Sequence, residues 1–155
     1  VLPAETWVDL EAAAEAVHRA ESAIAQRHFH DAWGPSQVAM FVAGRSFFPG
    51  EDLGWVTEVR RGLDDLRLRA MEAYARAALG IGGTELPAAI RVARALVEGE
   101  PYRESGYLLL MEGLAREGNK AEGLRVYEKL RRRLRNELGV SPGEELQELH
   151  RQLLH

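Results

Sequence analysis

A row of basic side chains between residues 120 and 135 is the feature of this sequence whose spacing best supports a function. On a helix, residues at positions i, i+4 and i+7 share one face. This spacing holds for a row made of Arg125, Lys129 and Arg132, with Asn136 continuing the line. Such a row would attract an acidic partner protein by electrostatic steering. The alternative is an ordinary solvated helix face, because charged residues are the norm on protein surfaces.

Histidines and glycine-rich turns offer other chemistry, but their spacing does not support it. His28-x-His30-Asp31, with His18, places imidazoles and a carboxylate near one another. Residues 28–31 contain neither the Glu-x-x-His nor the His-x-x-x-His spacing of helical metal sites, so we expect no metal. Gly80-x-Gly82-Gly83 is similar to a phosphate loop, yet a predicted helix precedes it where such a loop requires a strand.

The remaining polar groups do not form a recognisable catalytic set. The acidic pair Glu144-Glu145 consists of sequence neighbours, so we expect the two side chains to diverge. His150 and His155 are expected to face solvent. The absence of cysteine excludes thiolate metal sites, disulfides and a cysteine nucleophile. No catalytic residue and no cofactor is therefore predicted, and an enzyme is not expected.

The net charge of −4 is unevenly distributed along the 155 residues. Residues 119–139 carry seven basic and three acidic side chains, a balance of +4, so the rest of the chain carries −8. An acidic body is unsuited to duplex DNA, whose binding depends on neutralising phosphates. No apolar run reaches the roughly twenty residues that span a bilayer, and no signal peptide is visible. We therefore expect a cytoplasmic protein with no membrane partner.

Hydrophobic periodicity predicts an all-α fold of about seven helices. Gly139 is predicted to end the sixth helix in a left-handed conformation, and Ser141-Pro142 with Glu144 to cap the seventh. Gly34-Pro35 should break or restart the second helix, and Arg131 should pair with a carboxylate at the edge of the apolar row. The predicted helices cover about 9–26, a stretch within 31–45, 53–79, 84–98, the residues from Pro101 onward, about 120–138, and the segment from Ser141 to the C-terminus. Residues 1–9 are expected to be extended, and residues 47–52 to form a loop.

A repeat of 34 residues relates two parts of the chain. The first copy is marked by Ala89, Ala93, Leu96 and Pro101, and the second by Gly123, Tyr127 and Leu130. This period is typical of tetratricopeptide repeats. Two copies are too few for an open solenoid, so flanking helices must cover the ends. We therefore predict a tetratricopeptide-like antiparallel helix-pair stack with a concave face suited to binding.

The stretch from Gly118 to Leu154 resembles the bacterial transcriptional activator domain of SARP-type transcriptional regulators. The resemblance is carried by the pattern Gly-Leu-x-x-Tyr-x-x-Leu-Arg-x-x-Leu-x-x-Glu-Leu-Gly-Val-x-Pro and by the leucine-rich end. Weaker matches fall on Trp55, Arg60 and Leu63, and on Arg103-Glu104, which we expect to be structural. The resemblance implies that residues 9–155 form this domain and that residues 1–8 are the remnant of a linker or of the last strand of an upstream winged-helix domain.

The same resemblance implies the partners: the chain itself as a possible homodimer, an RNA polymerase subunit, or an adjacent DNA-binding domain. DNA would be bound only through a missing N-terminal winged-helix domain, an expectation that agrees with the first residue being Val1. Two alternatives stay open. One is a free-standing tetratricopeptide-type scaffold, and the other is a sensor whose groove binds a small molecule such as a nucleotide.

Overall fold

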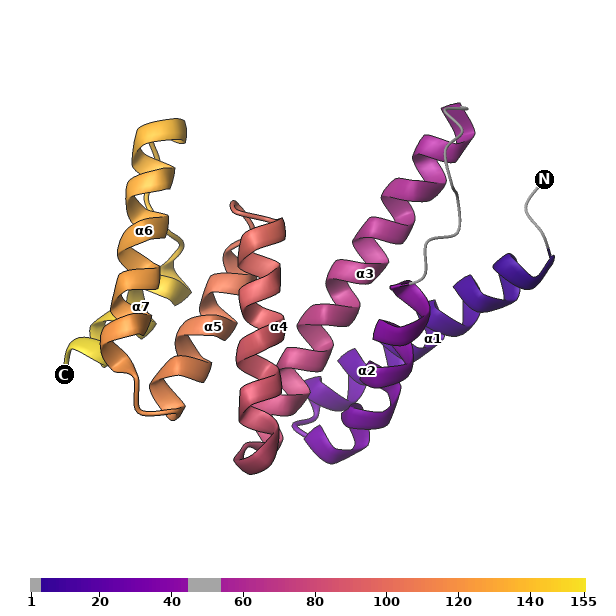
Figure 1. The fold of residues 1–155 in the computed structure, drawn as a ribbon, viewed down its shortest axis with the longest axis horizontal. Coiled ribbons are helices and arrows are strands. Elements are labelled where there is room, and N and C mark those ends of the chain that lie inside the picture. The colour runs from indigo at the N-terminus through magenta and orange to yellow at the C-terminus, as the bar shows by residue number, and fades with distance from the viewer. Residues whose placement is uncertain (1–3, 45–53) are drawn as a thin grey trace. The chain divides into compact units, whose positions relative to one another are not determined.

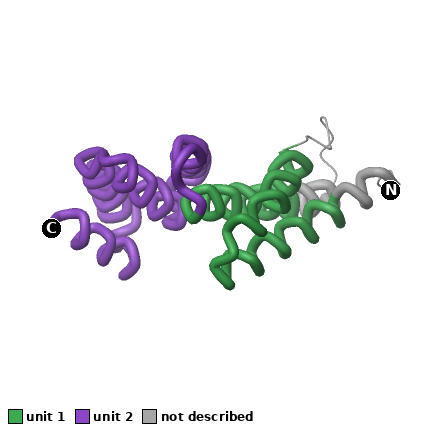
Figure 2. The backbone as a smooth tube through the Cα atoms, turned by 90° about the horizontal axis from the view of Figure 1, so that it is seen from below, with its two compact units in different colours: residues 1–80 green, residues 81–155 purple. Residues whose placement is uncertain are grey.

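The computed structural model describes residues 4–44 and 54–155, and of residues 4–9 and 54–60 it describes the backbone alone. In these ranges the chain forms seven α-helices and one short 3-10 helix, with no strand (Figure 1). This confirms the predicted all-α class. The helices are α1 (Ala4–Ala25), α2 (Phe29–Ala43), α3 (Gly54–Ile81), α4 (Leu86–Gly99), α5 (Glu104–Arg116), α6 (Lys120–Leu138) and α7 (Glu144–Leu154). They fall into two compact units, residues 1–80 and 81–155 (Figure 2).

Unit 1 holds α1, α2 and α3 around a core built largely of alanine. Small side chains let helix backbones approach closely, so the core needs few large residues. Phe29 begins α2 after a turn in which Arg27 adopts a positive φ of 60°. The buried cluster that joins the three helices consists of Ala13, Ala16, Val17, Ala39, Ala43, Leu66 and Ala70.

Helix α2 runs unbroken through Pro35, so the predicted break at Gly34-Pro35 is wrong. Proline removes one N–H and crowds the carbonyl of the residue four positions earlier. The helix tolerates this because Ala32, Ser36 and Ala39 are buried on its inner face. The hydroxyl of Ser36 also donates to the carbonyl of Trp33 at 2.8 Å, which satisfies a buried polar group.

Gly80 lies inside α3, which continues two residues beyond the predicted end at residue 79 and stops at Ile81. A Cβ atom at this position would lie 2.1 Å from Cγ of Phe29. The missing side chain therefore makes room for the Phe29 ring, which α2 places on this part of α3. The turn itself comes later, where Gly82 and Gly83 have φ values of 71° and 54° that L residues rarely adopt.

Unit 2 holds α4 to α7, and Figure 1 shows α4 and α5 as neighbours joined by a short turn. Tyr107 to Met111 are all buried, as expected for a helix covered on several sides. A Cβ atom at Gly123 would lie 3.3 Å from Cδ1 of Leu153 and 3.6 Å from the carbonyl oxygen of Met111. This glycine therefore allows α6 to pack closely on both α5 and α7. The core of the unit consists of Tyr107, Leu108, Met111, Tyr127, Leu130, Leu134, Leu146 and Leu153.

Five helix starts differ from the predictions, and one of them is that of α2, which begins at Phe29, ahead of the predicted stretch 31–45. Helix α1 begins at Ala4, so the extended conformation expected for residues 4–9 is wrong. Thr84 lies within the 3-10 helix Gly83–Glu85 that precedes α4, and Pro101 lies in the turn before α5. Helix α7 begins at Glu144, and Gly143 stands at its N-cap, where Ser141 was predicted.

Several apolar residues that helical periodicity would bury are exposed instead. Leu138 and Leu154 are each 57% exposed, Val38 and Phe41 on α2 are 50% and 68% exposed, and Ala14 also faces solvent. Both leucines lie at the last position of their helix, Leu138 in α6 and Leu154 in α7. The predicted loop at residues 47–52 lies outside the described residues, as do the side chains of Trp55 and Arg60. In the part of the chain that is described, no helix is long and apolar enough to cross a membrane.

Candidate partner-binding surface

Helix α6 is fixed firmly at both ends and along one side. The Asn119 side chain accepts a hydrogen bond from the Glu122 amide at 3.4 Å, which caps the N-terminus. Gly139 ends the helix with a φ of 69°, as predicted, and its amide donates to the Arg135 carbonyl at 3.1 Å. Because Tyr127, Leu130 and Leu134 are buried in the core, the opposite face of α6 must point to solvent.

The predicted basic row lies on that solvent-facing side. Its members, which we call the α6 basic row, are Arg125, Lys129, Arg132 and Asn136, and all four are exposed. The Arg125 side chain is 81% exposed and lies 3.6 Å from a carboxylate oxygen of Glu122. Lys129 forms no ion pair with any described residue. The row therefore presents accessible positive charge on a rigid helix.

Glu128 partly neutralises the edge of this row. Arg131 donates to both of its carboxylate oxygens, at 2.9 and 2.7 Å, which confirms the predicted pairing of that arginine. Arg132 approaches the same carboxylate at 3.4 Å. These contacts, the Arg131 hydrogen bonds first, lower the pKa of Glu128 to about 2. The carboxylate therefore stays ionised, and keeps its arginine partners, well below the pH at which a free glutamate is protonated.

His150 was predicted to face solvent, and this is wrong. Its ring stacks on Tyr127 with centroids 4.0 Å apart and planes 13° apart, and the residue is partly buried. The contact joins the middle of α6 to α7. The leucine spacing of α7 does not predict this contact. A histidine on the flank of an apolar row also packs when the neighbouring helix offers an aromatic face.

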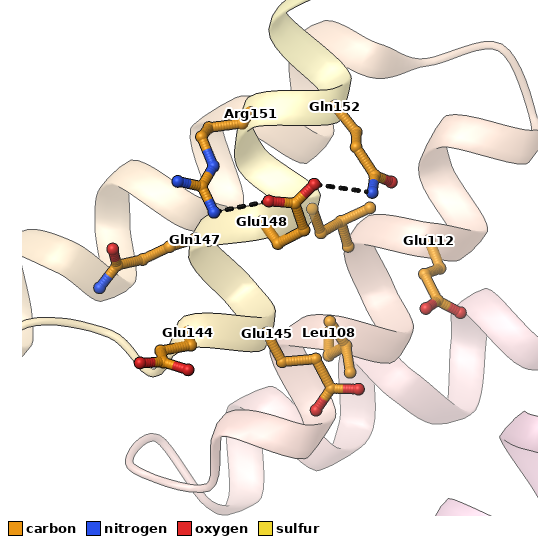
Figure 3. Close-up of a pocket in the computed structure, with 9 residues that line it drawn as sticks. Leu108, Glu112, Glu144, Glu145, Gln147, Glu148, Arg151 and Gln152 are labelled. Atoms are coloured by element: carbon orange, nitrogen blue, oxygen red, sulfur yellow. Dashed lines mark hydrogen bonds and ion pairs between the residues drawn. The ribbon is translucent and has the colours of Figure 1, made fainter.

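An acidic groove between α5 and α7 also went unnoticed in the sequence. Its volume is about 690 Å³, and it is lined by Glu112, Glu144, Glu145 and Glu148 together with Leu108 and Leu149. Figure 3 shows the row of polar side chains along α7 and Glu112 on the neighbouring α5. Glu144 and Glu145 both line the groove, and Figure 3 shows their side chains pointing away from each other, as expected for sequence neighbours. A single arginine, Arg151, accompanies the four glutamates.

Arg103-Glu104, expected to be structural, supplies one contact that holds this region in place. The Glu104 carboxylate accepts a hydrogen bond from the Gly143 amide at 2.9 Å. This contact anchors the corner between α6 and α7 to the start of α5. The position of the α7 glutamates therefore depends on a carboxylate 39 positions earlier in the sequence.

The histidines near the first turn do not assemble a site. Nδ1 of His28 lies 3.9 Å from an Asp31 carboxylate oxygen, and both side chains are well exposed. His18 faces solvent on α1. Among the side chains that the structure describes, those of residues 10–44 and 61–155, no three from His, Cys, Asp or Glu are grouped so that they could hold a metal ion.

The fold and its surfaces define a helical module with one basic and one acidic face in unit 2, and sequence comparison places that module in a family. The family model described as "Bacterial transcriptional activator domain" matches residues 8–154. The chain belongs to this family.

Curated relatives share parts of the sequence. The chain is 38% identical over 91 residues to the transcriptional regulator RedD of Streptomyces coelicolor, covering 59% of this chain and 25% of that protein. It is 48% identical over 60 residues to the regulatory protein AfsR of Streptomyces griseus, covering 39% of this chain and 6% of that protein. AfsR of Streptomyces coelicolor matches with the same identity and coverage. The chain thus spans no more than a quarter of the length of these relatives.

Proposed function

We propose that this chain is the regulatory, protein-interaction domain of a SARP-type transcriptional activator that acts in the bacterial cytoplasm. In this proposal the α6 basic row docks an acidic surface of a partner protein. The candidate partners are a second copy of the chain, an RNA polymerase subunit and an adjacent DNA-binding domain. The family match favours this role over that of a free-standing scaffold, because relatives that share the sequence are regulators of transcription.

The observation that carries the proposal is the exposed α6 basic row on a helix that the core holds rigid. Side chains on a fixed element offer a partner a constant pattern of charge, which favours both rapid encounter and rejection of wrong partners. The rest of the chain is acidic, with a net charge of −8 outside residues 119–139. The row is therefore the main positive feature that an acidic partner would meet.

The small number of cations in the α6 basic row argues against DNA as its ligand. Three cations release only about three counterions, so binding to a duplex would be weak and would fade near physiological salt. Contact with DNA is assigned in this proposal to an N-terminal winged-helix domain outside this chain. In this proposal the ligand of the α6 basic row is a protein.

Changing Arg125, Lys129 and Arg132 together to glutamate tests the proposal in the full-length regulator. We expect promoter binding and melting temperature to stay near the wild type, because exposed charges contribute little to stability. Activation of transcription should fall several-fold, because the reversed row repels its acidic partner. The measurements are promoter affinity and transcript yield from the same preparation.

A matched control reverses three exposed arginines elsewhere, Arg61, Arg91 and Arg94, on α3 and α4. This variant has the same net charge as the α6 variant, so it separates a local effect from a general one. Full activation by the α6 variant, or an equal loss of activation in both variants, would mean that the row is an ordinary solvated helix face.

A further inference from the structure

The basic row on α6 and the acidic groove beside α7 have the same spacing. On α6, Lys129, Arg132 and Asn136 stand at positions i, i+3 and i+7. On α7, the groove is lined at the same spacing by Glu145, Glu148 and Gln152. Each row consists of two charged side chains followed by an amide, and the charges are positive on α6 and negative on α7. With the two helices side by side and parallel, Lys129 meets Glu145, Arg132 meets Glu148, and the two amides face each other.

The contacts that these side chains already make are weak enough to exchange. Glu148 pairs with Arg151 at 2.5 Å, with the two side chains 54% and 65% exposed, and accepts from Gln152 at 3.1 Å. Arg132 pairs with Glu128 at 3.4 Å and is itself 72% exposed. Exposed ion pairs of this kind contribute little to stability. Replacing them with pairs across an interface therefore costs little.

The groove also suits long basic side chains in shape. Glu112 on α5 faces the α7 row across a hollow of about 690 Å³, with Leu108 and Leu149 contributing apolar surface (Figure 3). Lysine and arginine bury their aliphatic stems on apolar surface while the charged ends reach polar groups. The leucines would contact the aliphatic stems, and the glutamates would pair with the charged ends.

We propose that the α6 basic row of one copy of this chain docks into the α5–α7 acidic groove of a second copy. The inference deepens the proposed function and rests on it, since it names the partner of the same α6 row. It commits to a second copy because the row and the groove match in charge order and in spacing. A two-fold pair makes the contact twice, since each copy supplies one row and one groove.

Charge exchange tests this pairing on the chain as it stands. One variant carries Lys129→Glu and Arg132→Glu, and the other carries Glu145→Lys and Glu148→Lys. We expect sedimentation to show a wild-type dimer at low salt that weakens as salt rises, because the contact is electrostatic. Each variant alone should dimerise about tenfold or more weakly, because like charges then face each other across both contacts.

An equimolar mixture of the two variants should recover the dimer. In the mixture the acidic α6 of one variant meets the basic α7 of the other, and the basic α6 meets the acidic α7. A misfolded variant would show no recovery, so circular dichroism of each variant serves as the folding control. A wild-type chain that is monomeric at low salt, a dimer unaffected by either variant, or well-folded variants that stay monomeric when mixed would each overturn the inference.

The outcome is separable from that of the proposed function. If the wild-type chain is monomeric while the triple α6 variant loses activation, the row serves another protein and only the inference fails. If the mixture recovers the dimer while the triple variant activates fully, the pairing stands and the role of the row in activation fails.

Discussion

Leu134→Ala is expected to lower the free energy of unfolding of unit 2 by about 2–5 kcal/mol, as large truncations in protein cores do. Leu134 is only 3% exposed and belongs to the cluster that joins α5, α6 and α7. Removing its branched end leaves a cavity that α6 cannot close, because Gly123 already brings this helix into close contact with Met111 and Leu153. The lost burial and the remaining cavity both contribute to the cost.

Leu138 supplies the control for this prediction. It lies one turn further along α6 and is 57% exposed, so Leu138→Ala should change stability by no more than about 0.5 kcal/mol. Urea unfolding followed by far-ultraviolet circular dichroism measures both variants. Similar stabilities for the two would mean that the apolar row of α6 is not part of the core.

Gly80→Ala is expected to destabilise unit 1 by about 1–3 kcal/mol through overpacking. The reason is the Phe29 ring, whose Cγ, Cδ1 and Cδ2 atoms would lie 2.1 to 2.4 Å from the new methyl carbon. Alanine otherwise favours a helix interior over glycine by nearly 1 kcal/mol, so propensity alone predicts the opposite sign. A stabilised variant would show that the ring is free to move away from α3.

Gly62 lies in the same helix and gives a matched comparison. A Cβ atom there would meet nothing within 4 Å, so Gly62→Ala should stabilise the unit by roughly 0.5–1 kcal/mol. Tryptophan fluorescence reports on unfolding of this unit, because all three tryptophans lie within residues 1–80 and Trp33 packs on Tyr74 with ring centroids 4.7 Å apart. The two substitutions should therefore shift the unfolding midpoint in opposite directions.

The periodic apolar rows were sufficient to predict the helices of unit 2, because each row is long and faces a buried partner. Tyr127, Leu130 and Leu134 fall on one face, and all three are buried. Gly139 was predictable for a different reason. A left-handed residue after a helix is a local requirement that glycine meets best, and no distant contact is needed.

The first turns of helices were predicted less well, since local capping signals compete with distant contacts. Ser141, Pro142 and Glu144 have the pattern of a capping box, but α7 begins only at Glu144. The carboxylate of Glu104 accepts a hydrogen bond from the Gly143 amide instead, and Pro142 is buried just before the helix begins. A residue from another helix therefore decides where α7 starts.

The acidic groove could not be predicted because its walls come from two helices. Glu112 lies 33 positions before Glu145, and nothing local to either residue indicates that α5 and α7 will form one hollow. The α6 basic row was visible because all its members lie on one helix, where spacing alone fixes the face. The role of Gly80 also depends on a distant residue. It lies inside α3, where a phenylalanine from α2 leaves no room for a side chain.

Photo-crosslinking from position 129 tests most directly whether the α6 basic row is a protein-docking surface. A photoreactive residue replaces Lys129 in the full-length regulator, assembled with its promoter and RNA polymerase, and a second sample carries it at Arg91, exposed on α4. We predict a crosslink from position 129 to protein, whether a second copy, a polymerase subunit or the adjacent DNA-binding domain, and a much lower yield from position 91. A crosslink from position 129 to DNA, or equal yields from both positions, would contradict the account.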